Sequence, residues 1–312
     1  MLRYLLTQTG SLLVTMIIVI AMVYFGMRLL PGDPAVIRAG LDASPEQVEN
    51  TRRALGLDRP LHIQFGSYIS GLLQGDFGDS WRQNRSVLDI IRDRLPVTLL
   101  LAGVAYVLSL LLGFALGILS GSMPGSIWDR AVRVYTTIGL SFPEFWIAFV
   151  LILIFAVNLP WLPLLGYPGN APLLERLRHL LLPALTLALP RSAALARLTR
   201  ALLVGERTQD YVRTARSKGL GKFAVVRHIT VNTLPGTFPL AALELGGLLT
   251  GVIIAEQVFS LPGLGTLLLG SIGARDYEIV QGMTILAILV FTAVNWLADL
   301  AQALADPRIR YA

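Results

Sequence analysis

Residues 97–120 read VTLLLAGVAYVLSLLLGFALGILS, a run without a single charged side chain. An α-helix rises about 1.5 Å per residue, so about 20 apolar residues cross the hydrocarbon core of a bilayer, which is about 30 Å thick. Further stretches that are long and apolar enough occupy residues 11–30, 132–159, 181–202, 237–258 and 280–304. The sequence therefore predicts an all-α membrane protein with about six transmembrane helices.

The first stretch, 11–30, is longer than the apolar core of a signal peptide, and no small-residue cleavage site follows it. We therefore expect it to be the first membrane helix. The fourth stretch, 181–202, is the weakest candidate because Pro183, Pro190, Arg191 and Arg197 interrupt it. Prolines are tolerated in membrane helices where neighbouring groups satisfy the freed backbone.

The composition fits a membrane protein. Hydrophobic residues make up 54% of the chain and charged residues 15%, well below the quarter or so that is typical of soluble domains. Cysteine is absent, which excludes disulfides and thiolate metal sites. The net charge of +6 comes mainly from arginines that lie in short segments beside apolar runs. This placement is typical of membrane topology determinants, and it predicts no nucleic-acid partner.

The positive charges also predict an orientation. The segment between the fourth and fifth spans carries Arg207, Arg213, Arg216, Lys218, Lys222 and Arg227. The turn between the second and third spans carries Arg130 and Arg133, and the tail carries Arg308 and Arg310, on the same side. Lysine and arginine are enriched on the cytoplasmic side of membrane proteins, so both termini are expected in the cytoplasm.

The long loop 31–96 is expected outside, and its sequence predicts helices. The stretch 44–47 has the form of a capping box with proline at the first helical position, and Gly56 is a suitable stop. Apolar residues then recur at helical spacing over 61–73, which indicates an amphipathic helix on the outer surface. The loop can be a cap packed on the bundle, a docking surface for an external partner, or both.

Patterns that carry catalytic chemistry are missing from the sequence. It has no phosphate-binding G-x-x-x-x-G-K-[ST] motif and no G-x-S-x-G, and His62, His179 and His228 have no metal-ligand spacing. We expect no enzyme activity, no catalytic residue, and neither a metal nor a cofactor site in this chain.

The most informative segment is 210–219, DYVRTARSKG, which continues through 228–235, HITVNTLP. Helix formers that end at a glycine predict a short cytoplasmic helix, a turn at 219–221, and a second helix that returns to the membrane. Physical chemistry alone leaves open that this segment is only a positively charged anchor.

This segment resembles the coupling-loop motif of binding-protein-dependent ABC importers, in the version found in the dipeptide/oligopeptide/nickel permease family. Ala215, Gly219, Leu234 and Pro235 match, and Arg213 and Thr214 replace the acid and first alanine of the general motif, as is common in the peptide branch. Further segments similar to that family, in order, are 31–34, 55–60, 75–78, 256–259, 262–265, 275–277, 281–282 and 306–310. Two residues depart from the family pattern, Leu261 for tryptophan and Glu278 for proline.

The resemblance implies a type I ABC importer permease bundle in a bacterial inner membrane. It implies a second permease subunit, expected to be a paralogue, an extracytoplasmic binding protein, and two ATP-binding subunits that hold ATP and Mg²⁺. The residues expected to couple to those subunits are Asp210, Tyr211, Arg213, Thr214, Ala215, Arg216, Lys218 and Gly219. The substrate class is short peptides, with nickel or a metal chelate as the alternative. A self-sufficient secondary transporter would require an inverted repeat, which the sequence does not display.

These expectations divide the chain into four parts. Residues 1–30 form the tail and first helix, 31–96 the extracytoplasmic helical loop, 97–304 a five-helix permease core that includes the coupling segment 205–235, and 305–312 a cytoplasmic tail.

Ionisable residues inside the apolar spans cost about 2.5–3.5 kcal/mol each on insertion scales and indicate function by default. Arg191 and Glu244 would differ in depth by about 8 Å, a gap that long side chains can bridge. We expect either a structural ion pair between them or an Arg191 that lines the pathway and meets a substrate carboxylate. Glu144 and Glu256 are further candidates, and Asn295, four residues before Asp299, is expected to form hydrogen bonds within the bundle.

Overall fold

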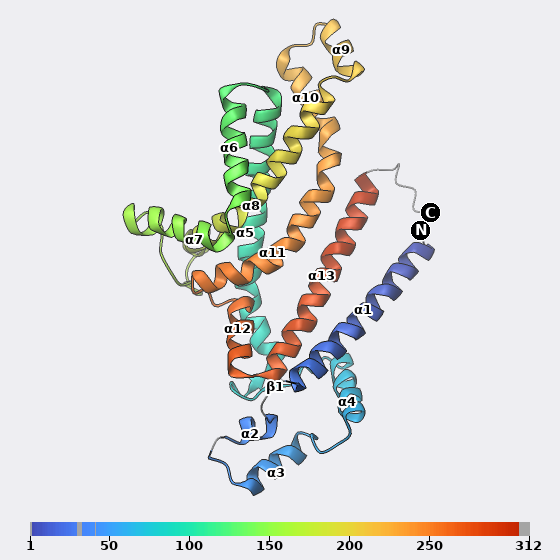
Figure 1. Cartoon of the computed structure of the whole chain (residues 1–312), viewed down its shortest axis with the longest axis vertical. Coiled ribbons are helices and arrows are strands. Elements are labelled where there is room, and N and C mark those ends of the chain that lie inside the picture. The colour runs from blue at the N-terminus through green and yellow to red at the C-terminus, as the bar shows by residue number, and fades with distance from the viewer. Residues whose placement is uncertain (1, 30–32, 41, 306–312) are drawn as a thin grey trace. The chain divides into compact units, whose positions relative to one another are not determined.

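The computed structural model describes residues 2–29, 33–40 and 42–305, and this part of the chain is built almost entirely of helices (Figure 1). The N-terminal helices are α1 (Leu2–Arg28), α2 (Pro34–Ala39), α3 (Pro45–Ala54) and α4 (Leu61–Leu73). Two strands of two residues each, β1 (Asp79–Ser80) and β2 (Arg85–Ser86), form a short antiparallel hairpin in which Asp79 pairs with Ser86. The remaining helices are α5 (Val87–Ser122), α6 (Ile127–Ser141), α7 (Glu144–Ile152), α8 (Leu173–Glu206), α9 (Asp210–Ser217), α10 (Lys222–Thr233), α11 (Phe238–Val258), α12 (Leu264–Ala274) and α13 (Tyr277–Ala305).

Five of the six predicted membrane spans correspond to helices or bent helix pairs that are long and apolar enough to cross a membrane. Over the described residues, Val87–Ser122, Leu173–Glu206 and Tyr277–Val294 are long and apolar enough to cross a membrane, and α1 contributes the shorter apolar stretch Val14–Gly26. The predicted fifth span corresponds to the pair Lys222–Leu248 and Thr250–Val258, which is bent by 46°.

The third span is not one continuous helix, as the prediction of 132–159 implied. Helices α6 and α7 meet at 112°. Phe142 is extended, with φ −101° and ψ 139°, because the ring of Pro143 disfavours helical geometry in the residue before it. A short π-helix, Leu153–Asn158, then continues α7.

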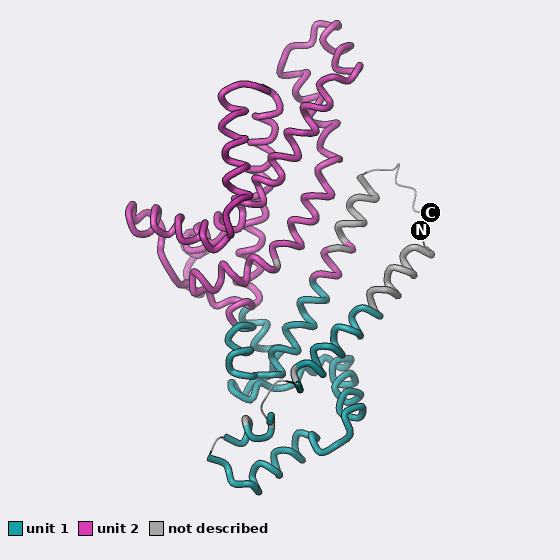
Figure 2. The backbone as a smooth tube through the Cα atoms, viewed as in Figure 1, with its two compact units in different colours: residues 1–94, 267–290 teal, residues 95–266, 291–312 magenta. Residues whose placement is uncertain are grey.

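The chain folds as two compact units (Figure 2). In the first, residues 1–94 and 267–290, the helices predicted within 31–96 are present as α3 and α4. Ser44 and Gln47 form the expected capping box, with Gln47 N to Ser44 Oγ at 3.3 Å and Ser44 N to Gln47 Oε1 at 2.8 Å. Helix α4 packs on α1 through the ring of Tyr24, whose centroid lies 5.1 Å from that of Tyr68.

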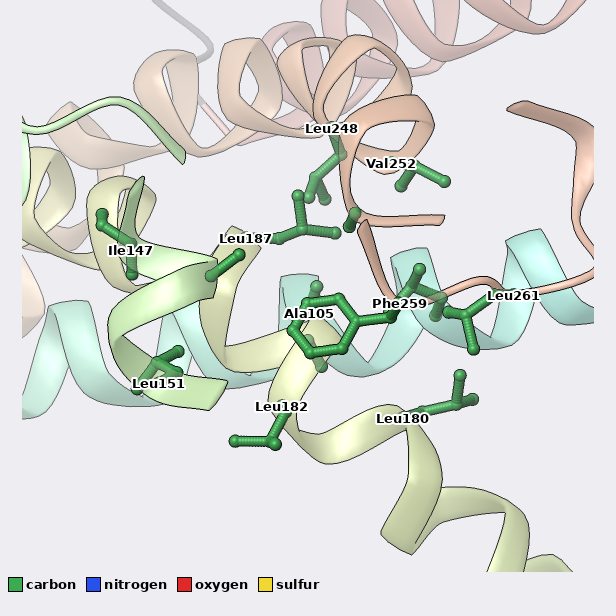
Figure 3. Close-up of a cluster of buried hydrophobic side chains, with 14 of the residues drawn as sticks. Ala105, Ile147, Leu151, Leu180, Leu182, Leu187, Leu248, Val252, Phe259 and Leu261 are labelled. Carbon is green, nitrogen blue, oxygen red and sulfur yellow. The ribbon is translucent and has the colours of Figure 1, made fainter. Parts of the chain in front are cut away.

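In the second unit, residues 95–266 and 291–312, helix α8 is the central element and packs against α6, α7, α10 and α11. Its prolines lie within a continuous helix. The core gathers buried side chains from α5, α7, α8 and α11 and from the residues just after α11, among them Ala105, Leu187, Leu248 and Phe259, which lie close together in Figure 3. Lipid tails are as apolar as these side chains, so close van der Waals packing, and not removal of apolar surface from water, is what such contacts contribute within a membrane.

Helices α5 and α8 meet along a row of glycines. A Cβ added at Gly113 or Gly121 would lie 2.8 Å or 2.7 Å from the Cβ of Leu195 or Leu203, and one at Gly117 would lie 2.6 Å from the Cβ of Thr199. Both rows repeat every four residues, the spacing of one face of a helix. Small residues at this spacing let two membrane helices approach closely.

Candidate functional site

The predicted helix, turn and second helix of the basic segment are present as α9 and α10. Helix α9 ends in a Schellman motif, in which Leu220 N donates to Ala215 O at 3.2 Å and Gly219 N donates to Arg216 O at 2.9 Å. Gly219 has φ +79°, a left-handed conformation that favours glycine. Gly219 therefore has a local structural role: it ends α9 and turns the chain toward α10.

One side of α9 is anchored and the other is free. Val212 is 1% exposed and packs in a cluster with Leu203 of α8 and with Val225 and Ile229 of α10. The side chains of Asp210 and Arg213 are 98% and 83% exposed. The helix thus presents a polar face to its surroundings while its apolar side is fixed to the end of α8.

The residues predicted to couple to partner subunits divide between these two sides. Tyr211 and Ala215 are half-buried, and the Tyr211 hydroxyl donates to Glu206 Oε2 at 2.8 Å. Burial raises the pKa of Tyr211 above its ordinary value. The exposed members are Asp210, Arg213, Thr214, Arg216, Lys218 and Gly219.

A second site lies where α7, α8 and α11 meet. Arg191 of α8 is 7% exposed, and its Nη1 lies 2.6 Å from Glu144 Oε1, while its Nε lies 3.9 Å from Glu244 Oε2. The guanidinium also donates to the carbonyl oxygens of Leu187 at 2.8 Å and Gly247 at 2.9 Å. The structure therefore brings together three of the predicted intramembrane residues, with Glu144 closer to Arg191 than the expected partner Glu244.

Gly251 makes room for this cluster. A Cβ at this position would lie 2.6 Å from Glu144 Oε2 and 2.9 Å from Arg191 Nη2. The cluster therefore requires a glycine at position 251 as well as its three charged residues.

Glu256 belongs to a separate arrangement. Its buried carboxylate accepts hydrogen bonds from Thr98 Oγ1 at 2.6 Å, Gly265 N at 2.7 Å and Thr266 N at 3.2 Å. The two backbone donors lie in the first turn of α12, so the carboxylate caps that helix. Asn295, also a predicted candidate, belongs to α13, but its side chain is outside the described part of the structure.

Sequence reasoning missed an ion pair at the start of α6. Asp129 is 1% exposed and accepts from Ser120 Oγ at 2.5 Å, Gly125 N at 2.9 Å and Arg200 Nε at 2.6 Å. Two side chains and one backbone amide therefore compensate this buried carboxylate. The available signal was that Asp129 is the only acid in the basic turn 121–133 and stands three residues after a capping serine.

Comparison with known proteins identifies the family. Residues 113–311 match the family described as the binding-protein-dependent transport system inner membrane component, and residues 1–102 match its N-terminal companion. The chain is 39% identical over 308 residues, 98% of both chains, to a protein of Brucella abortus (strain 2308) named for a peptide transport system permease. It is 38% identical over 312 residues, 100% of both chains, to the glutathione transport system permease protein GsiC of Salmonella typhi.

Solved structures agree on the fold. An inward-facing structure of the MetNI methionine ABC transporter matches with a TM-score of 0.57 at 18% identity, covering 70% of this chain and 97% of that one. An amino acid ABC transporter crystallised with histidines matches with a TM-score of 0.52 at 18% identity, covering 69% and 94%. This multi-pass inner-membrane chain therefore belongs to the binding-protein-dependent transport system inner membrane components, the permease subunits of ABC importers, which are not themselves enzymes.

Proposed function

We propose that this permease forms part of the pathway for short peptides and is driven by ATPase subunits that contact helix α9. The observation that carries the coupling role is the two-sided character of α9, with Val212 buried against α8 and a free polar face on the opposite side. The peptide class is supported by the names of relatives at 38–39% identity, which refer to peptides and to glutathione, itself a tripeptide.

The anchored side of α9 supplies a physical route for coupling. A partner that engages the exposed face would move α9, and the buried contacts with Leu203, Val225 and Ile229 would carry that movement into α8 and α10. Packed elements of this kind move as bodies and do not deform continuously. ATP and Mg²⁺ belong to the partner subunits in this scheme.

The charged cluster has a positioning role in the same proposal. Arg191 is 7% exposed and is engaged by two carboxylates and two carbonyls, whereas Glu144 and Glu244 are each 22% exposed. We therefore assign Arg191 to holding α7, α8 and α11 together, and the two carboxylates to the surface that a substrate can reach.

Membership of the family supports a proposal for the assembly. We propose a second permease subunit, a paralogue of this one, with two ATP-binding subunits on the cytoplasmic side and a binding protein on the outer side. Both termini of this chain then lie in the cytoplasm, in agreement with the basic segment 205–235.

The test is ATP hydrolysis by the complex that co-purifies with this chain, reconstituted in liposomes with its binding protein. Short peptides and glutathione should stimulate hydrolysis, and nickel should not. Stimulation by nickel alone would be consistent with the importer role but would show that the proposed substrate class, short peptides, is wrong. If no ATPase subunit co-purifies, the coupling role fails and a secondary transporter has to be reconsidered.

A variant pair addresses α9 directly. Gly219→Val places a β-branched residue at φ +79° and should distort the end of α9, which would lower substrate-stimulated hydrolysis while assembly persists. Gly221→Ala is the matched control, because that residue has φ −65° and open space around it. Equal activity of the two variants would count against the role of α9.

A further inference from the structure

A pocket of about 410 Å³ lies beside α9, at the ends of α5 and α8. Three cationic side chains line it, those of Arg207, Arg216 and Lys222, and its lining contains no acidic residue. Among the described residues no ion pair involves any of the three. The pocket therefore carries an uncompensated positive charge.

The polar side of the pocket is already ordered. The Nη1 of Arg207 donates to the carbonyl oxygens of Gly121 at 3.1 Å and Ser122 at 2.7 Å, which fixes the guanidinium at the C-terminal end of α5. Ser122 lines the same pocket, and its hydroxyl oxygen is buried and has no hydrogen-bond partner within the described part of the chain. Lys222 is the first residue of α10, whose free backbone N–H groups favour an anion at that end.

The other side chains that line the pocket form its aliphatic wall and are Leu203, Leu220, Val225, Val226 and Ile229. The natural ligand is therefore amphipathic, with one anionic group and a hydrocarbon portion. A free inorganic anion would leave this wall unused.

The position of the pocket indicates the source of such a ligand. The predicted spans end at residues 120 and 202, and the lining residues Gly121, Ser122, Leu203 and Arg207 follow within about one or two helical turns. This is the level at which lipid headgroups meet the hydrocarbon core. Basic pockets between transmembrane helices are known binding sites for anionic lipid headgroups.

We propose that this pocket binds the phosphate of an anionic phospholipid, with the beginning of an acyl chain against the aliphatic wall. The acidic side chain of a partner protein is the competing occupant, but α9 offers the exposed Arg213 and Lys218, outside the pocket, for such a side chain. Arg216 is itself exposed, but it lies four residues from the buried Val212 along the helix and borders the pocket.

The proposal is tested by native mass spectrometry of the full-length chain, released from detergent that contains phosphatidylglycerol or phosphatidylcholine. The wild type should retain phosphatidylglycerol in preference to phosphatidylcholine. Arg216→Gln with Lys222→Gln should lower that retention about tenfold or more. The control, Arg213→Gln with Lys218→Gln, removes the same charge from exposed side chains outside the pocket and should retain the lipid as the wild type does.

Four outcomes would overturn the proposal. The first is equal retention of the two lipids, and the second is an equal loss in both double variants, which would indicate surface charge alone. The third is displacement of the lipid by glycerol 3-phosphate at equal concentration, which would identify a soluble phosphate ester as the ligand. Addition of the ATPase subunits should leave the bound lipid in place, and its release would assign the pocket to the ATPase contact instead.

Discussion

Arg191 shows how one charge is accommodated inside an apolar bundle. Its guanidinium meets Glu144, Glu244 and two backbone carbonyls, so the cost of burial is offset by several short contacts from three helices. Removing one partner of a buried pair is more harmful than removing all of them, because the remaining charge is left without compensation.

This asymmetry gives a prediction for variants of the cluster. Arg191→Met should destabilise the purified chain by about 3–5 kcal/mol, as expected for a broken buried pair. The triple variant Arg191→Met, Glu144→Gln, Glu244→Gln should recover most of the loss in a thermal unfolding assay. A triple variant no more stable than the single one would mean that Arg191 acts through other contacts.

Gly251 gives a second prediction at the same site. Gly251→Ala should cost about 1–3 kcal/mol, because the added methyl overlaps the Glu144 and Arg191 side chains. Gly246→Ala on the same helix is the control, since its new Cβ meets only Phe291 at an ordinary 3.8 Å. The two melting temperatures should separate clearly, and similar values would show that the cluster relaxes without cost.

At the level of elements, the glycine row of α5 makes a comparable prediction. Gly117→Ala would push α5 away from Thr199 and Ala196 of α8 and should lower the thermal stability of the chain by about 1–3 kcal/mol. Gly103→Ala, on the same helix with nothing within 4 Å of the new Cβ, should be neutral or slightly stabilising. If the two substitutions behave alike, close approach at this seam is not important for stability.

Several helices and their ends could be predicted from the sequence. The capping box at Ser44, the amphipathic helix 61–73 and the pair α9–α10 with its turn at Gly219 were predictable, because each depends on residues close together in the chain. Helix α12 was not predicted. It is too short to read as a span, and the carboxylate that caps it comes from Glu256 in the preceding helix.

The contacts of the charged residues were likewise predictable only in part. Depth along the spans placed Arg191 near Glu244, but the closer contact with Glu144 depends on the 112° bend between α6 and α7, which periodicity does not specify. Asp129 and Arg200 are 71 residues apart, and only the folded bundle brings them together.

For the whole molecule, the absence of cysteine allows a clean test of orientation. Ser217→Cys and Asp58→Cys each introduce a single thiol at an exposed position. A membrane-impermeant maleimide added to intact spheroplasts should label the cysteine at 58 and reach the one at 217 only after the membrane is permeabilised. The opposite pattern would invert the proposed topology.

The interlocked rows of α5 and α8 also limit how these helices can move. Glycines 113, 117 and 121 each receive one side chain of α8. A shift by a single residue would need a rotation of about 100° to bring the next side chains to these glycines, because successive residues differ by that angle around a helix. The next register that fits lies about four residues away, a displacement of about 6 Å. Over this length α5 and α8 therefore move together as a rigid body. A displacement of α8 at Leu203 is transmitted to the level of Gly113, because the two helices do not slide past each other.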